Sequence, residues 1–380
     1  MTFKVKTKGQ NEGEELLVPK LRFKEFNKEY KKYKIRDTLK VKSGKDQKLI
    51  ECINGKYPIL GTGGQIGTTN SFLYDKPSVL IGRKGTINKP QYMTTPFWTV
   101  DTLFYTDIKE EFNTKYIFYT FQNINWKKYD ESTGVPSLSC KTIEEILYYI
   151  PNKDEQDKIS AFITLLDKKI ELQNQKIEAL KRYKKGLMQK LINSNNCKEK
   201  RISEFGTIIT GTTPSKLIQS YWHNGTIVWV TPSDITESKD IYNSHDMLTP
   251  DGLKAGRFVP AGSILITCIA SIGKNAILKV DGSCNQQINA IIPNKNFNAD
   301  YLYYLFELKK DYLQSTAGTS ATSIINKTSF EKLVFKIHNI EQQNEYSKIL
   351  NCLESKIETE KHKFKKLTLL KKSLLQQMFI

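Results

Sequence analysis

The chain has 380 residues, of which 39% are hydrophobic and 26% charged, and 58 Lys and Arg against 40 Asp and Glu give a net charge of +18. This length favours two or three domains. The sequence has no apolar run near the roughly 20 residues of a membrane helix, and its charged first residues do not resemble a secretory signal, so we expect a cytoplasmic protein. The charge permits a polyanionic partner such as nucleic acid. The six Cys and four His residues are scattered, which argues against a zinc site or a disulfide framework.

Taken in chain order, the sequence repeats itself over nearly its whole length. The first copy contains KIRDTLKVKSG, PSVLIGRKGTIN, NTKYIFYTF and ISAFITLLDKKI, beginning at residues 34, 77, 113 and 159. Their counterparts RISEFGTIITG, GSILITCIASIG, NADYLYYLF and YSKILNCLESKI begin at residues 201, 262, 298 and 346. The second copy is about 18 residues longer near YWHNGTIVWVTPSDIT, which indicates a loop-rich region there. The predicted order is therefore globular part, helix, globular part, helix.

Each globular half is predicted to be mixed α/β. Short β-branched and aromatic runs are broken by Gly, Pro, Asn and Ser, with one helix around residues 116–121 or 301–306. The order of the strands does not follow from the sequence. We expect boundaries at residues 1–152, 153–196, 197–338 and 339–380.

The segment from Lys153 to Ile192 contains no Pro and only one Gly, Gly186, which predicts one long helix. Apolar residues alternate four and three apart, as in a coiled-coil seam, with polar interruptions at Gln173 and Lys184 that recur as Glu360 and Lys371 in the second helix. The central seam residues are Ile163, Leu166, Ile170, Ile177, Leu180, Leu350, Leu353, Ile357, Phe364 and Leu367.

Two related helices that follow related domains are expected to pack antiparallel about a pseudo-two-fold axis. Forty helical residues at about 1.5 Å each span on the order of 60 Å, against roughly 34 Å for one DNA turn. The pair could therefore hold two domains one turn or more apart on DNA. A homodimerising coiled coil is the alternative interpretation of the seam.

The order and double occurrence of several short segments resemble the specificity subunits of type I restriction-modification systems. These segments are VPKLRFKEF (18–26), KSGK (42–45), STGVPSLS (132–139), IPNKDEQ (150–156), TGTTP (210–214), WVTPSDI (229–235), SATSIINKT (320–328), IHNIEQQ (337–343) and LLQQMF (374–379). The second helix start differs in having His338 where the first has Pro151, which questions how abruptly that helix begins.

The resemblance implies two target-recognition domains, each followed by a long α-helix, with the helices packed as an antiparallel coiled-coil spacer. It also implies that the chain selects a bipartite DNA sequence and carries no catalytic centre or cofactor. The partners would be double-stranded DNA, two methyltransferase subunits that use S-adenosylmethionine to modify adenine, and two restriction subunits that use ATP and Mg to translocate and cleave. The sequence agrees in lacking an Asn/Asp-Pro-Pro-Tyr motif, a Walker lysine and a metal-ligand cluster.

GTGGQIGTT (61–69) lacks the spacing of a dinucleotide or P-loop motif. It is either a DNA-facing loop or a plain tight turn.

Arg83, Lys84 and Lys89 could reach phosphates or guanine. Ser271 and Lys274 lie in the matching region of the second half. Solvated surface charge would give the same pattern. Asn285, Gln286 and Gln287 could pair with adenine edges, or form a capping or core network. The full set of candidate DNA-binding residues is Lys45, Thr62, Thr68, Thr69, Arg83, Lys84, Lys89, Ser137, Thr212, Thr213, Lys216, Thr231, Ser233, Ser271, Lys274, Thr319 and Ser320.

Two other functions fit parts of the sequence. A coiled-coil scaffold without a nucleic-acid role would also explain the helices. A nucleotide-dependent enzyme built on the glycine-rich loop is disfavoured, because neither copy combines that loop with suitable acids or bases.

Overall fold

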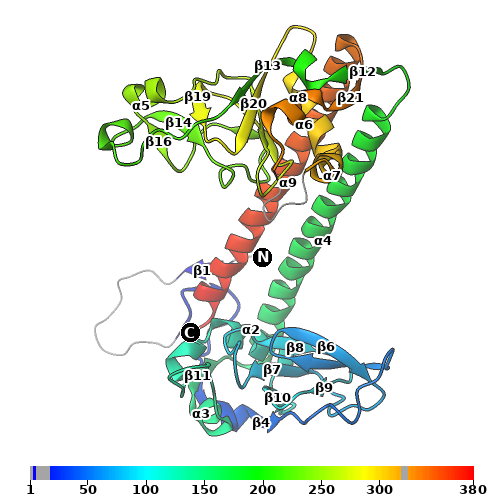
Figure 1. Ribbon diagram of the computed structural model, residues 1–380. Coiled ribbons are helices and arrows are strands. Elements are labelled where there is room, and N and C mark those ends of the chain that lie inside the picture. Colours follow the sequence, from blue (N-terminus) through cyan, green and yellow to red (C-terminus); the bar gives the residue numbers. More distant parts are fainter. Residues whose placement is uncertain (1–2, 6–17, 318–323) are drawn as a thin grey trace. The chain divides into compact units, whose positions relative to one another are not determined.

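The computed structural model describes residues 3–5, 18–317 and 324–380, which fall into two compact units (Figure 1). The first unit joins Met1–Asn174 with His362–Ile380, and the second is Gln175–Lys361. Each unit contains one half of the duplicated sequence and parts of both long helices. No helix in the described part of the chain combines the length and apolarity that a bilayer crossing requires.

The first α/β half is built on an antiparallel sheet of order β4-β10-β7-β8. A three-stranded sheet, β6-β5-β9, accompanies it, and β3 pairs with β11. A further antiparallel pair joins β1 to β2. The elements are β1 (Phe3–Val5), β2 (Leu21–Phe23), β3 (Lys31–Lys34), α1 (Ile35–Thr38), β4 (Leu39–Ser43), β5 (Tyr57–Gly61), β6 (Gly64–Thr69), β7 (Ser78–Gly82), β8 (Gln91–Met93), β9 (Trp98–Thr99), β10 (Leu103–Ile108), α2 (Thr114–Asn123), η1 (Trp126–Tyr129), α3 (Cys140–Glu145) and β11 (Leu147–Ile150).

The second half has a five-stranded sheet, β13-β20-β17-β18-β15, a three-stranded sheet, β16-β14-β19, and the pair β12-β21. Its elements are β12 (Lys198–Arg201), η2 (Ile202–Glu204), β13 (Gly206–Thr210), η3 (Gln219–Tyr221), β14 (Ile227–Val230), β15 (Asp240–Ile241), β16 (Met247–Leu248), α5 (Pro250–Ala255), β17 (Ile264–Thr267), β18 (Asn275–Leu278), β19 (Gly282–Cys284), β20 (Ile288–Pro293), α6 (Ala299–Leu308), α7 (Lys310–Ser315), α8 (Lys327–Lys332) and β21 (Val334–Ile337).

The two halves share one topology. The order β4-β10-β7-β8 recurs as β13-β20-β17-β18, and the pair β3-β11 recurs as β12-β21. The parallel pair β5-β9 recurs as the parallel pair β14-β19. The second half adds β15 and α5 in the region where its sequence is longer. The prediction of two duplicated mixed α/β domains is therefore confirmed.

Equivalent side chains begin the equivalent helices. The Asn113 side chain accepts a hydrogen bond from the Tyr116 amide at 2.8 Å, and Asn298 accepts one from the Tyr301 amide at 2.9 Å. These contacts satisfy an amide that a helix N-terminus otherwise leaves unpaired. The predicted helices at residues 116–121 and 301–306 are thus present as α2 and α6.

The two long helices are α4 (Lys153–Ile192) and α9 (Ile340–Met378). The Asn152 side chain accepts the Glu155 amide at 3.1 Å, and Asn339 accepts the Gln342 amide at 2.9 Å. Both helices therefore begin with the same asparagine cap, and His338 in place of Pro151 does not change how the second one begins.

Ion pairs define the direction in which the helices pack. Within the second unit, Lys176 pairs with Glu360 at 3.0 Å, and Lys184 pairs with Glu354. Residue numbers rise along α4 as they fall along α9, so the helices are antiparallel. Within the first unit Lys371 pairs with Asp167 at 2.6 Å. Three of the four polar interruptions in the predicted seam, Lys184, Glu360 and Lys371, therefore form ion pairs between the helices.

The seam residues lie on the inner faces of the helices. Ile163, Leu166, Ile177, Leu350 and Ile357 are buried. Five others are half-buried: Ile170, Leu180, Leu353, Phe364 and Leu367.

Each α/β half packs against parts of both long helices. In the first unit the Phe379 ring stacks on Tyr116 with centroids 5.1 Å apart, and the Leu375 carbonyl accepts a hydrogen bond from Asn123. In the second unit Met188 and Ile192 join the core that contains α6. Full burial of such side chains contributes about 1.5–3 kcal/mol each, so the helix ends belong to the cores of the domains.

Candidate nucleic-acid interface

A glycine in each half fixes the start of a surface loop. A Cβ atom on Gly44 would lie 2.0 Å from the Val100 carbonyl oxygen, and one on Gly211 would lie 2.1 Å from that of Asn285. Only glycine permits such a close approach of two backbones. The loops that follow β4 and β13 therefore leave their sheets at equivalent, tightly packed points.

A tryptophan holds each of these loops from the side. The Trp98 indole N–H donates to the Lys45 carbonyl at 2.9 Å, and the Trp229 indole N–H donates to the Thr212 carbonyl at 3.0 Å. Trp98 lies on β9, whose counterpart in the second half is β19. Trp229 lies on β14, whose counterpart in the first half is β5. The same contact is thus made from neighbouring strands in the two halves, and an alignment of residues could not have found it.

Four candidate residues of the first half lie together at the end of β7. Lys84 and Ser137 form a β-bridge, and the Leu138 amide donates to the Arg83 carbonyl at 2.9 Å. Thr62 lies beside Gly85, which has a φ of +84° and so favours glycine. The sequence had suggested these residues separately, from three different segments.

Arg83 is half-buried and its guanidinium has a defined position. Its Nη1 donates to the Asp101 carbonyl at 3.3 Å, and its Cζ lies 5.9 Å from the centre of the Phe104 ring. The Lys45 amide donates to the carbonyl of Thr99, two residues before Asp101. Lys45, Lys84 and Lys89 are exposed, and Lys84 directly follows Arg83 in the chain.

Two threonines of the glycine-rich segment, Thr68 and Thr69, have internal roles. Residues 61–64 form the β5–β6 hairpin turn, with Gly64 at a φ of +115°. The Thr68 hydroxyl donates to the Cys52 carbonyl at 2.7 Å and accepts the Gly55 amide at 3.0 Å. Thr69 is completely buried and accepts a hydrogen bond from the Ser71 amide. Thr69 therefore has no surface to offer to DNA, and residues 61–64 form a tight turn.

Lys216 forms the centre of an aromatic cluster in the second half. Its Nζ lies 3.6 Å from the centre of the Trp222 ring and 5.1 Å from that of Trp229, and it pairs with Asp246 at 2.5 Å. The hydrogen bond from Lys216 lowers the pKa of the Asp246 carboxyl. This arrangement combines cation–π and ionic contacts, which fix the lysine in place.

Thr212 and Thr213 border this cluster. Thr212 is half-buried, and no donor or acceptor reaches its buried hydroxyl within the described part of the chain. Thr213 is exposed and its hydroxyl donates to the Gln286 side chain.

Other candidates in the second half serve turns. The Thr231 amide and hydroxyl both donate to Asp234, and Ser233 contacts the Thr231 hydroxyl at 2.7 Å. Ser271 and Lys274 lie in the turn between β17 and β18, which the Thr267 hydroxyl holds together. Lys274 is exposed.

Asn285 and Gln287 form the internal network that was one of the two expectations for them. The Asn285 side chain donates to the Gln287 side chain at 3.1 Å and accepts the Gln287 amide at 3.0 Å. Thr319 and Ser320, also predicted to contact DNA, lie outside the described residues.

The structural counterpart of Arg83 is Cys268. The Arg83 amide donates to the Thr102 carbonyl, and the Cys268 amide donates to the Gln287 carbonyl at the equivalent position. Cys268 is only 4% exposed, and burial raises the pKa of its thiol to about 12. The same backbone frame therefore presents a guanidinium in one half and a buried thiol in the other.

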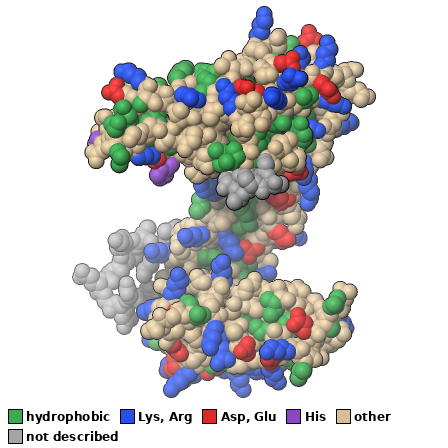
Figure 2. All heavy atoms as spheres, viewed as in Figure 1, with side chains coloured by type: hydrophobic (Ala, Val, Ile, Leu, Met, Phe, Trp, Pro, Cys, Tyr) green, Lys and Arg blue, Asp and Glu red, His purple; other side chains and the backbone are tan. Residues whose placement is uncertain are grey.

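Positive charge is also found away from these loops. Figure 2 shows Lys and Arg side chains along the edge of the first unit that carries α3 and β4. Part of this charge is matched by carboxylates, since Lys34 pairs with Glu145 at 2.5 Å and Lys42 pairs with Asp107 at 2.8 Å. These exposed pairs contribute little to stability and reduce the net charge of the edge.

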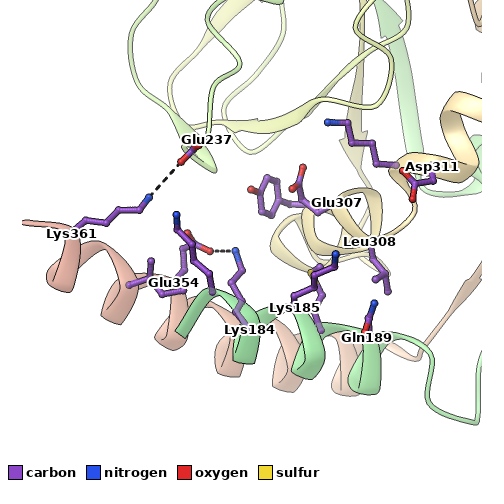
Figure 3. A pocket seen from close by; sticks show the side chains of 14 residues that line it. Lys184, Lys185, Gln189, Glu237, Glu307, Leu308, Asp311, Glu354 and Lys361 are labelled. Carbon is purple, nitrogen blue, oxygen red and sulfur yellow. Dashed lines mark hydrogen bonds and ion pairs between the residues drawn. The ribbon is translucent and has the colours of Figure 1, made fainter. Parts of the chain in front are cut away.

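A cavity of about 500 Å³ in the second unit lies where α4 and α9 meet the α/β half (Figure 3). Its lining mixes lysines with carboxylates, and some of them are paired: Lys184 pairs with Glu354, and Lys361 lies 3.9 Å from Glu237. Partial desolvation of its carboxyl raises the pKa of Glu307, a residue that is exposed and accepts a hydrogen bond from Asn275 at 2.7 Å. This balance of charges fits a joint between helix and domain better than an anion-binding site.

One buried glutamine joins each helix start to its domain, and neither was among the predicted site residues. Gln156 accepts the Asn113 amide and donates to the Pro151 carbonyl, and Gln343 does the same with Asn298 and His338. Both glutamines stand at the end of the repeated segments IPNKDEQ and IHNIEQQ, which was the available signal. Among the described residues, no group of three or more His, Cys, Asp or Glu side chains is suited to hold a metal ion.

Comparison with known proteins gives a family match over both halves. The model of the type I restriction modification DNA specificity domain matches residues 27–182 and 195–369. The MjaIX type I restriction enzyme specificity subunit of Methanocaldococcus jannaschii is 33% identical over 168 residues, which are 43% of this chain and 39% of that protein. The EcoR124I/EcoR124II specificity subunit of Escherichia coli is 29% identical over 160 residues, which are 40% of this chain and 39% of that protein. The chain thus aligns with about two fifths of the length of these relatives.

The fold also matches a solved structure. The S subunit of a type I restriction-modification system from M. genitalium superposes with a TM-score of 0.66 at 15% identity. The match covers 96% of this chain and 99% of that one, so the shared fold extends over nearly the whole molecule.

Proposed function

Because the chain belongs to the family of the type I restriction modification DNA specificity domain, we propose that it selects the DNA target of a type I complex. DNA sequence recognition is general to this family. The target is bipartite and asymmetric, with one half-site for each α/β half.

The proposal rests mainly on one observation: the two halves share a backbone arrangement around equivalent loops but carry different side chains on it. Gly44 and Gly211 fix equivalent loops, and a tryptophan holds each loop through the same hydrogen bond. At one equivalent position on this frame the first half has Arg83 and the second has Cys268. A molecule that reads two different half-sites needs a constant support whose surface side chains differ, and the half-buried Arg83, which has only the buried Cys268 as its counterpart, is consistent with this.

The proposed DNA contacts lie on the loops of each half. In the first, Arg83 reads a base, while Lys45, Lys84 and Lys89 contact phosphates, with the hydroxyls of Thr62 and Ser137 nearby. In the second, we propose contacts from Thr213, Ser233 and Lys274. Arg side chains commonly read guanine through two hydrogen bonds, whereas Lys more often positions the protein on the backbone.

The division of labour in the complex is also part of the proposal. Residues 1–152 and 197–338 act as target-recognition domains, and residues 153–196 and 339–380 form the spacer that sets the distance between the half-sites. The chain is non-catalytic and carries no cofactor. Two methyltransferase subunits use S-adenosylmethionine to modify adenine, and two restriction subunits use ATP and Mg. The names of the relatives as specificity subunits support this assignment.

Methylome sequencing tests the proposal directly. The chain is expressed with its methyltransferase partner in a host that lacks adenine methylation, and the expected result is one bipartite methylated motif. Replacing residues 1–152 by the matching part of a relative should change one half of the motif and leave the other unchanged. A motif that changes in both halves, or the absence of any motif in an assembled complex, would contradict it.

A further inference from the structure

The same tripeptide forms the tip of the equivalent loop in both halves. The loop after β4 contains DQKLIEC at 46–52, and the loop after β13 contains PSKLIQS at 214–220. Lys48, Leu49 and Ile50 therefore correspond to Lys216, Leu217 and Ile218, while the residues around them differ. We call these two tripeptides the KLI tips.

The leucine of each KLI tip is almost completely exposed. The exposed fraction is 101% for Leu49 and 93% for Leu217. Leucine is among the residue types most often buried, and one isolated exposed leucine needs no explanation. Two at equivalent positions of a duplicated loop are unlike such isolated cases.

The backbone holds both leucines at the same place in a turn. The Ile50 amide donates to the Gln47 carbonyl at 3.0 Å, and the Ile218 amide donates to the Ser215 carbonyl at 3.3 Å. Each leucine is thus the third residue of a four-residue β-turn. The turn directs its side chain away from the domain.

Further contacts fix the turns in position. In the first half the Asp46 side chain accepts the Lys48 amide at 2.7 Å, and the Cys52 amide donates to Thr68. In the second half the Trp222 indole donates to the Ser215 carbonyl at 3.0 Å, and Lys216 packs on the same ring. Both leucines are therefore presented by an ordered support.

We propose that Leu49 and Leu217 act as apolar wedges that insert at a base-pair step, one in each half-site; this rests on the proposed function. Aliphatic side chains that enter between base steps unstack them and bend the duplex, without reading the base identity. A contact that is independent of sequence explains why two halves with different reading surfaces keep an identical tripeptide.

The size of the KLI tips favours DNA over a protein partner. A stable protein interface needs about 800 Å² on each side, far more than a four-residue turn offers. A wedge needs only one or two side chains. The tips also leave the sheet beside Lys45 and Thr213, which are among the proposed DNA contacts.

The test uses the chain assembled with its methyltransferase subunits and duplexes carrying the methylated motif. Each duplex has 2-aminopurine at one position other than the methylated adenine, because unstacking raises its fluorescence. Leu49→Ala and Leu217→Ala are compared with the parent and with Leu147→Ala. Leu147 is a suitable control because it is 49% exposed on β11 and lies outside the proposed surface.

The expected result is specific to each half. Leu49→Ala should abolish the fluorescence rise in one half-site, Leu217→Ala in the other, and each should weaken DNA binding about ten-fold. The methylated motif should not change, and Leu147→Ala should behave like the parent.

Two results would overturn the wedge. The first is unchanged fluorescence and affinity in both variants. The second is weaker assembly with the methyltransferase in the absence of DNA, measured by size-exclusion chromatography, because it would assign the tips to a protein contact. A parent complex that methylates no motif would instead refute the proposed function, so the two failures can be told apart.

Discussion

A buried ion pair that connects β2 to the first turn of α4 makes a quantitative prediction. The guanidinium of Arg22 donates to both carboxylate oxygens of Glu155, each at 2.7 Å, and the two side chains are 4% and 1% exposed. Arg22 also donates to the Lys28 carbonyl at 2.5 Å, and the Tyr30 hydroxyl donates to Glu155 at 3.3 Å. Within the residues that the structure describes, each charge is therefore satisfied by the other and by a few fixed groups.

Removing either partner should leave the other charge buried and unpaired. Arg22→Met and Glu155→Gln are each expected to lower the free energy of unfolding of the first unit by about 3–5 kcal/mol. The double variant should lose less than either single variant, because a neutral pair carries no uncompensated charge. The second copy has Gln342 at the position of Glu155, so an amide is compatible with this helix start.

Hydrogen–deuterium exchange along a urea series measures the local free energy in the full chain. Peptides covering residues 18–34 and 147–160 report on the pair, and peptides from the second unit serve as the internal control. Losses below about 1 kcal/mol in the single variants, or losses that simply add in the double variant, would refute the reasoning.

Three further predictions follow from the other sites. Arg83→Ala should cost about 1–3 kcal/mol of discrimination at one motif position in one half-site, whereas Lys84→Ala should slow methylation of all duplexes alike; methylation rates on single-position variants of the motif measure both. Glu307→Gln should raise the free energy of unfolding of the second unit by about 1 kcal/mol at pH 8, because its amide can donate to the buried Asn275 Oδ1, which no donor reaches within the described residues. The gain should shrink at pH 5. Desolvation raises the pKa of Glu307 in the folded protein, so the parent loses stability as the pH rises through this raised pKa. Glutamine does not titrate, so the variant does not lose this stability. Duplicating residues 173–176 in α4 and 359–362 in α9 adds about 6 Å, or nearly two base pairs at about 3.4 Å each, and should lengthen the gap in the methylated motif without changing its halves.

The long helices could be predicted from the sequence because their signal is local. Forty residues without proline and with a regular apolar spacing give a helix with the bounds Lys153–Ile192. The polar interruptions Lys184 and Lys371 could also be located, but their partners Glu354 and Asp167 depend on the antiparallel register. The internal repeat made that register plausible, since related helices were expected to pack about a two-fold axis.

The sheet order and the site could not be predicted in the same way. Glu155 and Arg22 are separated by 133 residues, and no periodicity connects them. Strand pairing joins distant segments such as β4 and β10, whose short apolar runs are compatible with several partners. Hydroxyl residues were equally ambiguous, because the pattern does not distinguish a buried Thr69 from an exposed Thr213.

The exchanged tryptophans suggest how the two halves can differ in surface and still share one fold. Trp98 on β9 and Trp229 on β14 donate the same hydrogen bond, although they occupy different strands of the parallel pair. The loop is therefore held by an indole N–H at the same position relative to its backbone in both halves, although the two tryptophans do not align in sequence. Side chains that face outward from this frame, such as Arg83, contribute little to the core and can be substituted at small cost to folding. Under the proposed function, selection on the half-sites could then act on each loop surface separately, while the glycine and tryptophan contacts keep the loops in place.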